Sequence, residues 1–286
     1  MTKNNLLLIT FIIIINSCAA VETSNLPESL TVIPEVNENQ KFIDYLDSDW
    51  EQTLINNPLF ATYTGDKRFN DKINPNTIDQ FNKVRNQDLE SLKKLMAINE
   101  EKLDKDNKLN YKLKKFDIES DLNLSQFPIY YLRLNQRGGI QSFYETGNRL
   151  VYQSKKDYED WLNRLSQFTE NIYTFLEINK EGLEKGYTQP KLVTRGVISQ
   201  IDAIINSDIE LNPYLKVFLE ANEEYFSKDE KEKLINDAKQ LIQKEINPAY
   251  ESLNNFLKNQ YLINSRESIG IKDIPDGKKY YEQLAK

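Results

Sequence analysis

SKKDYEDWLNRLSQFTENIYTFL, residues 154–176, carries the clearest helical pattern in the sequence. Its apolar side chains recur every three or four residues, which is the spacing of one face of an α-helix. Ser154 and Asp157 precede this run as in a capping box in which Asp replaces Glu. The stretch therefore predicts a long amphipathic helix, whose buried face comprises Tyr158, Trp161, Leu162, Leu165, Phe168, Ile172, Phe175 and Leu176.

Helical signals continue towards the C-terminus. Gly186 predicts the end of this helix, and Pro190 suits the first turn of the next one. Ser227 and Glu230 form a regular capping box, and Pro248 predicts an end or a kink in the helix that follows. The apolar stripes between these signals comprise Val193, Val197, Ile201, Ile204, Leu234, Ile235, Ala238, Leu241, Ile242, Tyr250, Leu253, Phe256, Leu257 and Tyr261.

Three further helices are expected on the N-terminal side. The first ends at Asn57-Pro58, because a residue before proline avoids the α conformation. The second is a single long helix from Thr77 to about Leu103, and the third follows it. Their buried stripes are predicted to include Phe42, Tyr45, Leu46, Trp50 and Leu54, then Leu89, Leu95 and Met96, then Leu109, Leu113, Phe116 and Ile118.

The middle of the chain is less regular. Phe127–Leu134 holds a proline among aromatic residues and predicts a short extended segment, while Gly138-Gly139 and Gly147 predict a loop. Polar groups beside these glycines are candidates for lining a pocket, because sites often lie on loops held by rigid elements. The alternative is that they only satisfy the backbone of the loop. The candidates are Tyr131, Arg133, Asn135, Gln136 and Arg137.

Composition supports an all-α fold, an irregular array of long amphipathic helices without a fixed-length repeat. Hydrophobic residues make up 39% of 286, with nine Gly and nine Pro. The net charge is −7 and no Lys/Arg cluster stands out, so nucleic acid is not expected as a partner. The chain has no histidine, which excludes Ser-His-Asp triads, Cys-His dyads and His-Glu-x-x-His zinc sites within it.

Two segments are rich in carboxylates. We interpret both as solvated acidic surface. The first segment faces away from the stripe of Phe42, Tyr45 and Leu46, and in the second, residues two apart on a helix do not share a face. A metal or acid/base site is the alternative for the second of them. The segments hold Asp44, Asp47 and Asp49, and Asp117, Glu119 and Asp121.

The only cysteine, Cys18, closes a short apolar run, Leu6–Ile15, that follows Lys3. This pattern is typical of a secretory signal peptide, and the run is too short for a helix that crosses a bilayer. A cysteine in that position resembles the lipobox of bacterial lipoproteins, in which the thiol is acylated. A plainly cleaved signal and an uncleaved anchor are the alternatives. Ala19 after the cysteine favours the outer membrane, with the protein facing the periplasm.

The predicted organisation is a signal peptide over residues 1–17, a flexible tether over 18–40 and a helical domain over 41–286. The tether is inferred from its polar composition and its prolines, Pro27 and Pro34. The membrane, reached through lipid on Cys18, is thus the first expected partner.

Several segments, in order, resemble the family called domain of unknown function 885. They are Asn57–Asp66, Leu109–Tyr111, Leu134–Gly139, Asp157–Leu165, Asn247–Tyr250, Ser268–Gly270 and the Pro275–Gly277 turn before Tyr280-Tyr281. The resemblance implies an all-helical, often lipid-anchored or secreted bacterial protein related to thermolysin-like zinc metallopeptidases. In that family a His-Glu-x-x-His helix and a further Glu hold zinc beyond the point that matches Lys286. No catalytic residue is therefore expected in this chain, and no cofactor, although zinc is expected in the full-length family.

Two functions remain open. The chain resembles the N-terminal half of a zinc-dependent peptidase, an incomplete half of a larger helical fold, with its C-terminal half as the expected partner. The end of the sequence after Lys286 favours this interpretation. The alternative is a non-enzymatic lipoprotein scaffold that binds peptides or an envelope partner. If a half is missing, the face of Tyr280, Tyr281 and Leu284 is expected to lack a packing partner.

Overall fold

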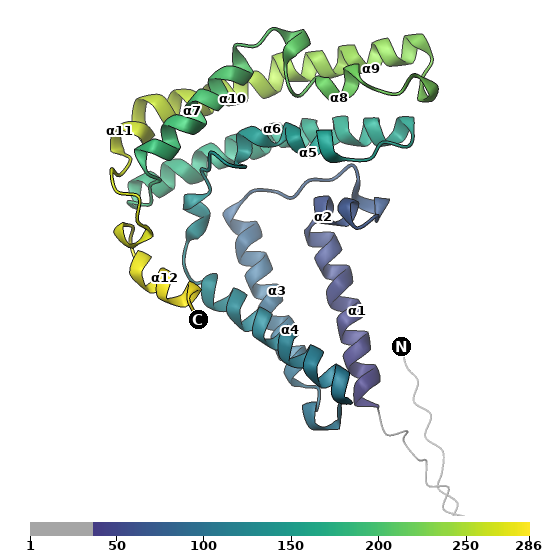
Figure 1. The fold of residues 1–286 in the computed structure, drawn as a ribbon, viewed down its shortest axis with the longest axis vertical. Helices are drawn as coiled ribbons and strands as arrows, with labels where there is room; N and C mark the ends of the chain where they lie inside the picture. Colours follow the sequence, from purple (N-terminus) through teal and green to yellow (C-terminus); the bar gives the residue numbers. More distant parts are fainter. Residues whose placement is uncertain (1–36) are drawn as a thin grey trace, which may run out of the picture. The chain divides into compact units, whose positions relative to one another are not determined.

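The computed structural model describes residues 37–286, which form one unit. Within that range the regular elements are helical, and the one β-type pairing is an isolated bridge between Pro190 and Arg266 (Figure 1). The predicted all-α class is confirmed. The α-helices are α1 Glu38–Asn56, α2 Pro58–Tyr63, α3 Ile78–Met96, α4 Lys105–Leu124, α5 Tyr144–Arg149, α6 Lys155–Glu184, α7 Lys191–Ile205, α8 Lys216–Leu219, α9 Lys228–Leu241, α10 Asn247–Phe256, α11 Leu262–Asn264 and α12 Gly277–Leu284.

Helices α5 to α11, which we call the body, surround the buried face of α6. Helix α10 packs on both α6 and α7, and α9 packs on α6 (Figure 1). Trp161 and Leu165 are almost fully buried at the centre of a core of 28 side chains. The stripe that predicted α6 is thus the face on which the body is built, with only Leu162 of that stripe partly exposed.

Some ends of these helices follow their sequence signals and others do not; Pro190, for example, is the N-cap of α7 and not part of its first turn. Gly186 has φ +80° after α6, and the N–H of Tyr187 returns to the carbonyl of Gly182 at 2.8 Å. The capping box of Ser227 before α9 is present. The box expected at Ser154 is not: its hydroxyl donates to Asp157 Oδ2, which accepts from the Gln153 N–H instead. The shorter Asp side chain explains the altered partner.

The helical path does not end at Pro248, because π-turns accompany this proline. A π segment, Ile242–Ile246, joins α9 to α10, and a second, Leu257–Tyr261, joins α10 to α11. Proline has no N–H to donate and would crowd the preceding turn of a regular α-helix. The wider π-turn accommodates it, so the helical path continues from Lys228 to Asn264.

Helices α1, α3 and α4, which we call the arm, have a separate and smaller core. It comprises Phe42, Tyr45, Leu95, Ile98, Leu103, Tyr111 and Ile118. The start of α1 lies against the connection between α3 and α4, where the N–H of Asn99 donates to Glu38 Oε2 at 2.7 Å. Helix α1 begins at Glu38, within the stretch that was assigned to the tether.

Three predictions for the arm were wrong. The long helix expected to reach Leu103 ends at Met96, and a 3-10 turn, Glu100–Lys102, follows it. Trp50 is 47% exposed and packs edge-on against Phe60 rather than in the core. Most of the apolar stripe expected to be buried on α4, and two residues of α3, are exposed because no described helix covers them: Leu89, Met96, Leu109, Leu113 and Phe116.

Two predictions for the middle were also wrong. Phe127–Leu134 is not extended but contains a 3-10 turn, Ile129–Leu132, that begins after Pro128. Gly147 is not in a loop but inside α5, where its backbone lies against the ring of Trp161. A Cβ at this position would come within 2.4 Å of that ring, so close packing explains the glycine.

At the C-terminal end, the Pro275–Gly277 turn has Asp276 at φ +54° and leads into α12. Helix α12 contacts α4, and Tyr280 meets Phe127 with ring centroids 5.5 Å apart. The neighbouring Tyr281 and Leu284 are exposed. In residues 37–286 no helix is long and apolar enough to span a membrane. Cys18 and its lipobox lie outside the described residues.

Candidate binding cleft

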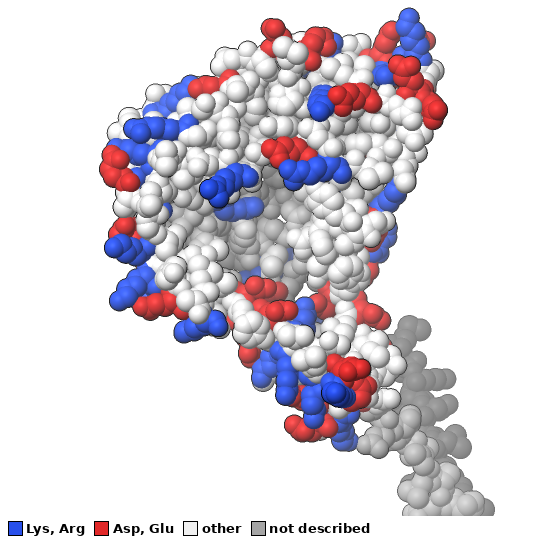
Figure 2. Space-filling view, viewed as in Figure 1, with Lys and Arg blue, Asp and Glu red and all other residues white. Residues whose placement is uncertain are grey.

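A cleft of about 1220 Å³ lies between the arm and the body. Figure 2 shows it as a hollow in the face of the molecule. One wall comes from α1, α3 and α4, and the other from α6 and from residues 132–143. The cleft is larger than the usual range for small-molecule sites, about 300–1,000 Å³. Its size is therefore suited to an extended ligand.

The arm wall carries a connected set of polar groups. Lys114 Nζ lies 2.5 Å from Asp49 Oδ2, and Ser91 donates to the other oxygen of that carboxylate at 2.9 Å. Ser91 also meets the hydroxyl of Tyr45 at 2.8 Å. Burial raises the pKa of Tyr45 to about 12, so its hydroxyl stays protonated. This network fixes α1, α3 and α4 relative to one another along the cleft.

Three further carboxylates of the arm, Asp88, Asp117 and Asp121, face the same cleft. Burial, and after it the charges of Asp121 and Asp49, raise the pKa of Asp88 to about 6 against the opposing charge of Lys114. This wall therefore holds more negative charge than its one lysine neutralises, and Asp88 changes charge near neutral pH.

The body wall is aromatic and rich in amides. The rings of Phe143 and Phe168 stack with centroids 4.2 Å apart, and both line the cleft. Asn171 of α6 donates to the carbonyl of Asn74 at 2.8 Å and accepts from the N–H of Asn76 at 2.9 Å. These bonds hold the loop before α3 against α6 and form the floor of the cleft.

Arg133 is the cation of the body wall. Its guanidinium bonds to Asn76 Oδ1 and lies 5.3 Å from the centre of the Phe81 ring. Among residues 37–286 no carboxylate forms an ion pair with it. Solvent reaches the side chain through the cleft, but surrounding protein atoms lower its pKa by desolvation. Arg133 thus presents an uncompensated positive charge towards the acidic wall of the arm.

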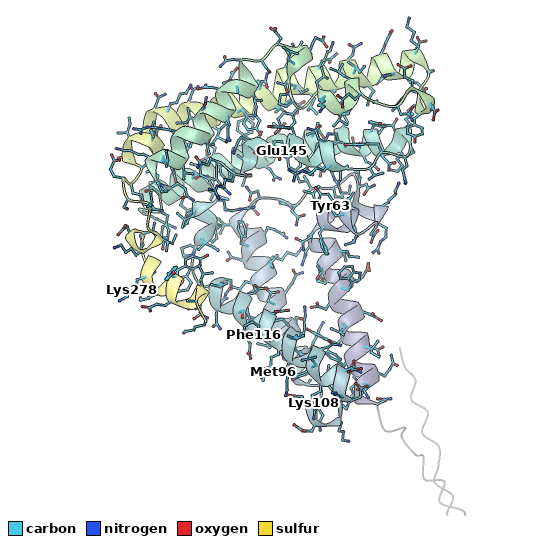
Figure 3. All side chains as sticks on the ribbon, viewed as in Figure 1. Tyr63, Met96, Lys108, Phe116, Glu145 and Lys278 are labelled. Carbon is cyan, nitrogen blue, oxygen red and sulfur yellow. The ribbon has the colours of Figure 1, made fainter. Side chains whose placement is uncertain are left out.

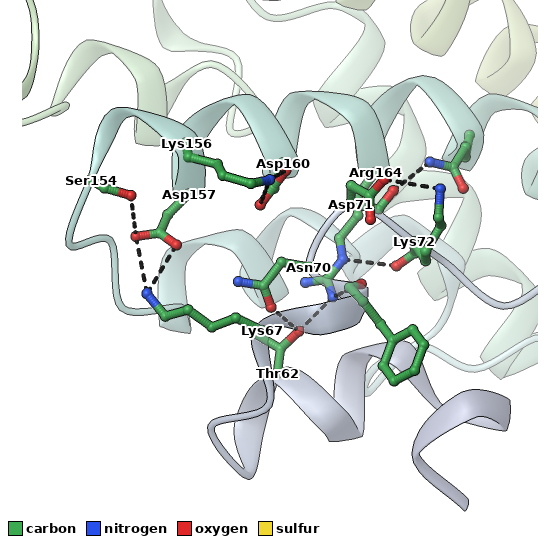
Figure 4. Close-up of polar contacts among 12 residues, drawn as sticks. Thr62, Lys67, Asn70, Asp71, Lys72, Ser154, Lys156, Asp157, Asp160 and Arg164 are labelled. Atoms are coloured by element: carbon green, nitrogen blue, oxygen red, sulfur yellow. Dashed lines mark hydrogen bonds and ion pairs between the residues drawn. The ribbon is translucent and has the colours of Figure 1, made fainter. Parts of the chain in front are cut away.

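The cleft is held together at its base by a buried arginine of α6. Arg164 is fully buried and donates to the carbonyls of Lys72 at 2.8 Å and Phe69 at 2.9 Å (Figure 4). It also donates to the carbonyl of Pro58 at 3.1 Å and to Thr62 Oγ1 at 2.5 Å. One side chain therefore ties the whole connection between α1 and α3 to the body.

An ion pair supports the same junction. Lys67 Nζ lies 3.2 Å from a carboxylate oxygen of Asp157 near the start of α6 (Figure 4). Burial alone would raise the pKa of Asp157, but its bonds from the Gln153 N–H, Lys67 and Ser154 outweigh burial and lower the pKa. The first turn of α6 and the α2 region are thereby linked through charge as well as through hydrogen bonds.

The structure separates the five residues predicted to line a pocket. Arg133 and Asn135 line the cleft. Tyr131 is buried on the other side of the turn, where it donates to Glu181 at 2.6 Å. Gln136 and Arg137 line a smaller cavity beside Gln200, whose Nε2 donates to the carbonyl of Gln136 at 2.9 Å.

Asp49, Asp88, Lys114, Asp117 and Asp121 line the cleft. The favoured interpretation of Asp49, Asp117 and Asp121 was solvated surface, with a site only as the alternative for the segment of Asp117 and Asp121, and Asp88 and Lys114 were not singled out. The acidic segments were compared only at a spacing of two residues. A spacing of four residues, as between Asp117 and Asp121, places both on one helix face, and this signal pointed to a shared surface. Nothing in the sequence indicated that α3 would bring Asp88 beside them.

The zinc expected in the full-length family does not fit the described part of this chain. No group of three His, Cys, Asp or Glu side chains in residues 37–286 is arranged to hold a metal ion. The carboxylates of the cleft are too dispersed to make such a set, and one is paired with Lys114.

The family model named "Bacterial protein of unknown function (DUF885)" matches residues 58–286. The chain belongs to this family. The match includes α3, α4, α6 and the 132–143 loop, and thus most of both walls of the cleft. Among curated proteins none matches the chain.

A crystal structure described as "the putative lipoprotein from Colwellia psychrerythraea" is similar to this DUF885 chain, with a TM-score of 0.72 and 19% sequence identity. The match covers 86% of this chain and 45% of that one. At this identity the likeness establishes a shared fold. The chain spans less than half the length of the Colwellia chain.

Proposed function

We propose that this DUF885 protein is a lipid-anchored protein of the bacterial envelope whose cleft binds an extended peptide. The lipid anchor is supported by the lipobox-like Cys18 and by the description of the Colwellia neighbour as a lipoprotein. Ala19 after the cysteine supports placement in the outer membrane, with the protein facing the periplasm. Labelled palmitate should enter the wild type and not Cys18→Ala, and equal labelling of both would contradict the anchor.

The observation that carries the peptide proposal is the opposition of charge across the cleft. Arg133, which has no carboxylate partner among the described residues, faces an arm wall that carries Asp88, Asp117 and Asp121. A peptide supplies groups of both signs, a terminal carboxylate and basic side chains, at the separation of several residues. Charge-assisted hydrogen bonds from arginine are well suited to a carboxylate.

The remaining lining suits the rest of a peptide. Amide side chains both donate and accept hydrogen bonds, as a peptide main chain requires. Stacked Phe143 and Phe168 offer apolar surface for its side chains. The amides of the cleft are Asn56, Asn57, Asn74, Asn76, Gln80, Asn135, Asn171 and Gln189.

The test uses the full chain and a library of short peptides made with either a free or an amidated C-terminus. Binders with a free carboxylate should lose roughly 10–100-fold in affinity for Arg133→Gln, the range expected for a hydrogen bond to a charged group. Arg137→Gln, outside the cleft, is the matched control and should bind like the wild type. Equal binding by Arg133→Gln, or no binder in the library, would refute the proposal.

A second candidate function follows from the coverage of 45% of the Colwellia chain. In that case the chain forms one wall of a larger peptidase cleft, and a further polypeptide with a His-Glu-x-x-His motif supplies the metal site. The purified chain alone should then show no chelator-sensitive cleavage of the peptide library. Such cleavage by the chain alone would refute this candidate, because the residues that it requires are not in this sequence.

A further inference from the structure

Helix α4 has two apolar faces, and only one of them is buried. Tyr111 and Ile118 face the core of the arm. Leu109, Leu113 and Phe116, spaced at i, i+4 and i+7, share the opposite face and are 59%, 53% and 60% exposed. A helix in water normally carries polar residues on that side, so this face indicates contact with something apolar.

A further exposed apolar residue lies at the end of α3. Met96, the last residue of α3, is 59% exposed, and α3 packs against α4. In Figure 3, Met96 lies in projection between Phe116 and Lys108 along this pair of helices. We call the surface of Met96, Leu109, Leu113 and Phe116 the hairpin patch. It lies on the arm, apart from the residues that line the cleft.

The charge around the hairpin patch differs from that of the chain as a whole. Residues 93–115 contain eight lysines and four acidic residues, a net charge of 8 − 4 = +4, whereas the whole chain carries −7. This segment is an exception to the absence of a basic cluster inferred from the overall composition. Lys108 and Lys112 pair with Glu101 and Glu100. Three other lysines pair with carboxylates outside the segment: Lys93 with Glu90, Lys114 with Asp49 and Lys115 with Glu119. Together with these three partners the segment carries a net charge of 8 − 7 = +1.

The hairpin patch also lies close to where the described chain begins. The N–H of Asp104, just before α4, donates to Asn39 Oδ1 at 3.0 Å, and Asn107 donates to the same oxygen at 3.1 Å. The 18 residues from Ala19 to Val36 connect Cys18 to this end of the arm. They span at most about 65 Å when fully extended, so lipid on Cys18 would keep this end of the arm near the membrane.

We propose that the hairpin patch docks on an anionic lipid surface. Apolar side chains flanked by lysines are the features of helices that lie in the membrane interface, with the apolar face among the acyl chains and the lysines at the headgroups. The lipid on Cys18 supplies proximity, and this inference rests on the proposed anchor in that respect. It does not depend on what the cleft binds.

The test places one fluorescent label on the full chain, through Leu113→Cys in the hairpin patch or Leu211→Cys as a control. Leu211 is also an exposed leucine, 76% exposed, but lies in the body between α7 and α8. Each protein is reconstituted into vesicles of phosphatidylglycerol and phosphatidylethanolamine, or of phosphatidylcholine alone. Lipids with a nitroxide on the acyl chain act as quenchers, and labelling of the wild type corrects for signal from Cys18.

In anionic vesicles the label at position 113 should shift to the blue and be quenched at least about twofold, since such faces lie about 5–10 Å into the interface. The label at 211 should do neither. The effect should weaken in phosphatidylcholine and when salt rises to about 1 M, where the Debye length is about 3 Å.

Equal behaviour of the two labels in anionic vesicles would overturn the proposal. So would a blue shift at position 113 in detergent that grows with protein concentration, because a second copy would then cover the patch. If Cys18→Ala abolishes palmitate labelling but the label at 113 is still quenched in the presence of anionic vesicles, docking stands independently of the anchor. If both are lost, while the acylated chain shows quenching at 113 and none at 211, docking of the hairpin patch requires the anchor, in agreement with the proposal.

Discussion

The body and the arm are both helical, but they bury apolar surface differently. The body packs 28 buried side chains into one core around α6, whereas the core of the arm has seven, five on its three helices and two in the connection between α3 and α4. In the body, the exposed sides of the long helices are mainly polar. In the arm, α4 presents apolar residues on both faces, and only one face has a partner among the described residues.

We infer from this difference that the body serves as the structural scaffold, whereas the arm supplies surface for binding. Burial of apolar area contributes roughly 25 cal/mol per Å², so the large core of the body supplies most of the stability. The arm contributes one wall of the cleft and the hairpin patch. It depends on the junction at Arg164 for its position relative to the body.

The largest expected effect comes from removing the central side chain of the body. Trp161→Ala should destabilise the chain by about 3–5 kcal/mol, because truncating a buried aromatic residue leaves a cavity. Trp50→Ala in the arm, where the indole is 47% exposed, should cost about 1 kcal/mol or less. Urea unfolding of the two variants measures the contrast. Equal losses would mean that the arm and the body share one cooperative core.

The next largest effect is expected from the loss of Arg164, which tests the junction between the arm and the body. Arg164→Leu removes the donor to one buried and two partly buried backbone carbonyls, which should cost roughly 2–4 kcal/mol. Hydrogen exchange should increase in residues 58–72 more than in α9. Arg149→Leu, an exposed arginine paired only with Glu145, is the control and should change stability by less than about 0.5 kcal/mol. Unchanged exchange in residues 58–72 would show that the arginine does not hold this connection.

The sequence predicted the body well because its signals are local. The stripe of α6, the stop at Gly186 and the capping box at Ser227 each involve neighbouring residues and need no knowledge of the fold. The π-turns near Pro248 were not predictable in the same way. They arise because α10 continues to pack on α6 and α7, which keeps the helix from breaking there.

The arm and the cleft were harder to predict. Periodicity shows that Leu109, Leu113 and Phe116 share a face, but not whether any other helix covers it. The cleft depends on residues far apart in sequence, such as Asp88, Asp121 and Arg133, which only tertiary packing brings to one space. Arg133 and Asn135 were candidates because they adjoin an irregular glycine segment, whereas Asp88 lies in the middle of an ordinary helix.

The smallest expected effect concerns the protonation of Asp88 in the arm wall. The pKa of Asp88 is about 6 in the folded chain, above the ordinary value near 3.8, so the folded state binds this proton more tightly. Its favourable contribution is therefore full below pH 4 and is lost as pH rises through about 6. Asp88→Asn should raise stability at pH 7 by about 1 kcal/mol at most, after allowing for solvent screening, and by nothing at pH 4.

The control for that experiment is Asp44→Asn, an exposed position on α1. Thermal unfolding of both variants across pH 4–8 measures the difference. A gain from Asp88→Asn that does not depend on pH would contradict the proposed protonation of the arm wall.

A peptide bound in the cleft between the arm and the body should slow hydrogen exchange on both walls of that cleft, and exchange of the full chain measures this. A library binder with a free C-terminus is added at saturating concentration, and exchange is compared with that of the free protein. We expect slower exchange in α3 and in residues 132–143, on both walls of the cleft, and no change in α9. Protection confined to the body outside the cleft, or none at saturation, would contradict the claim.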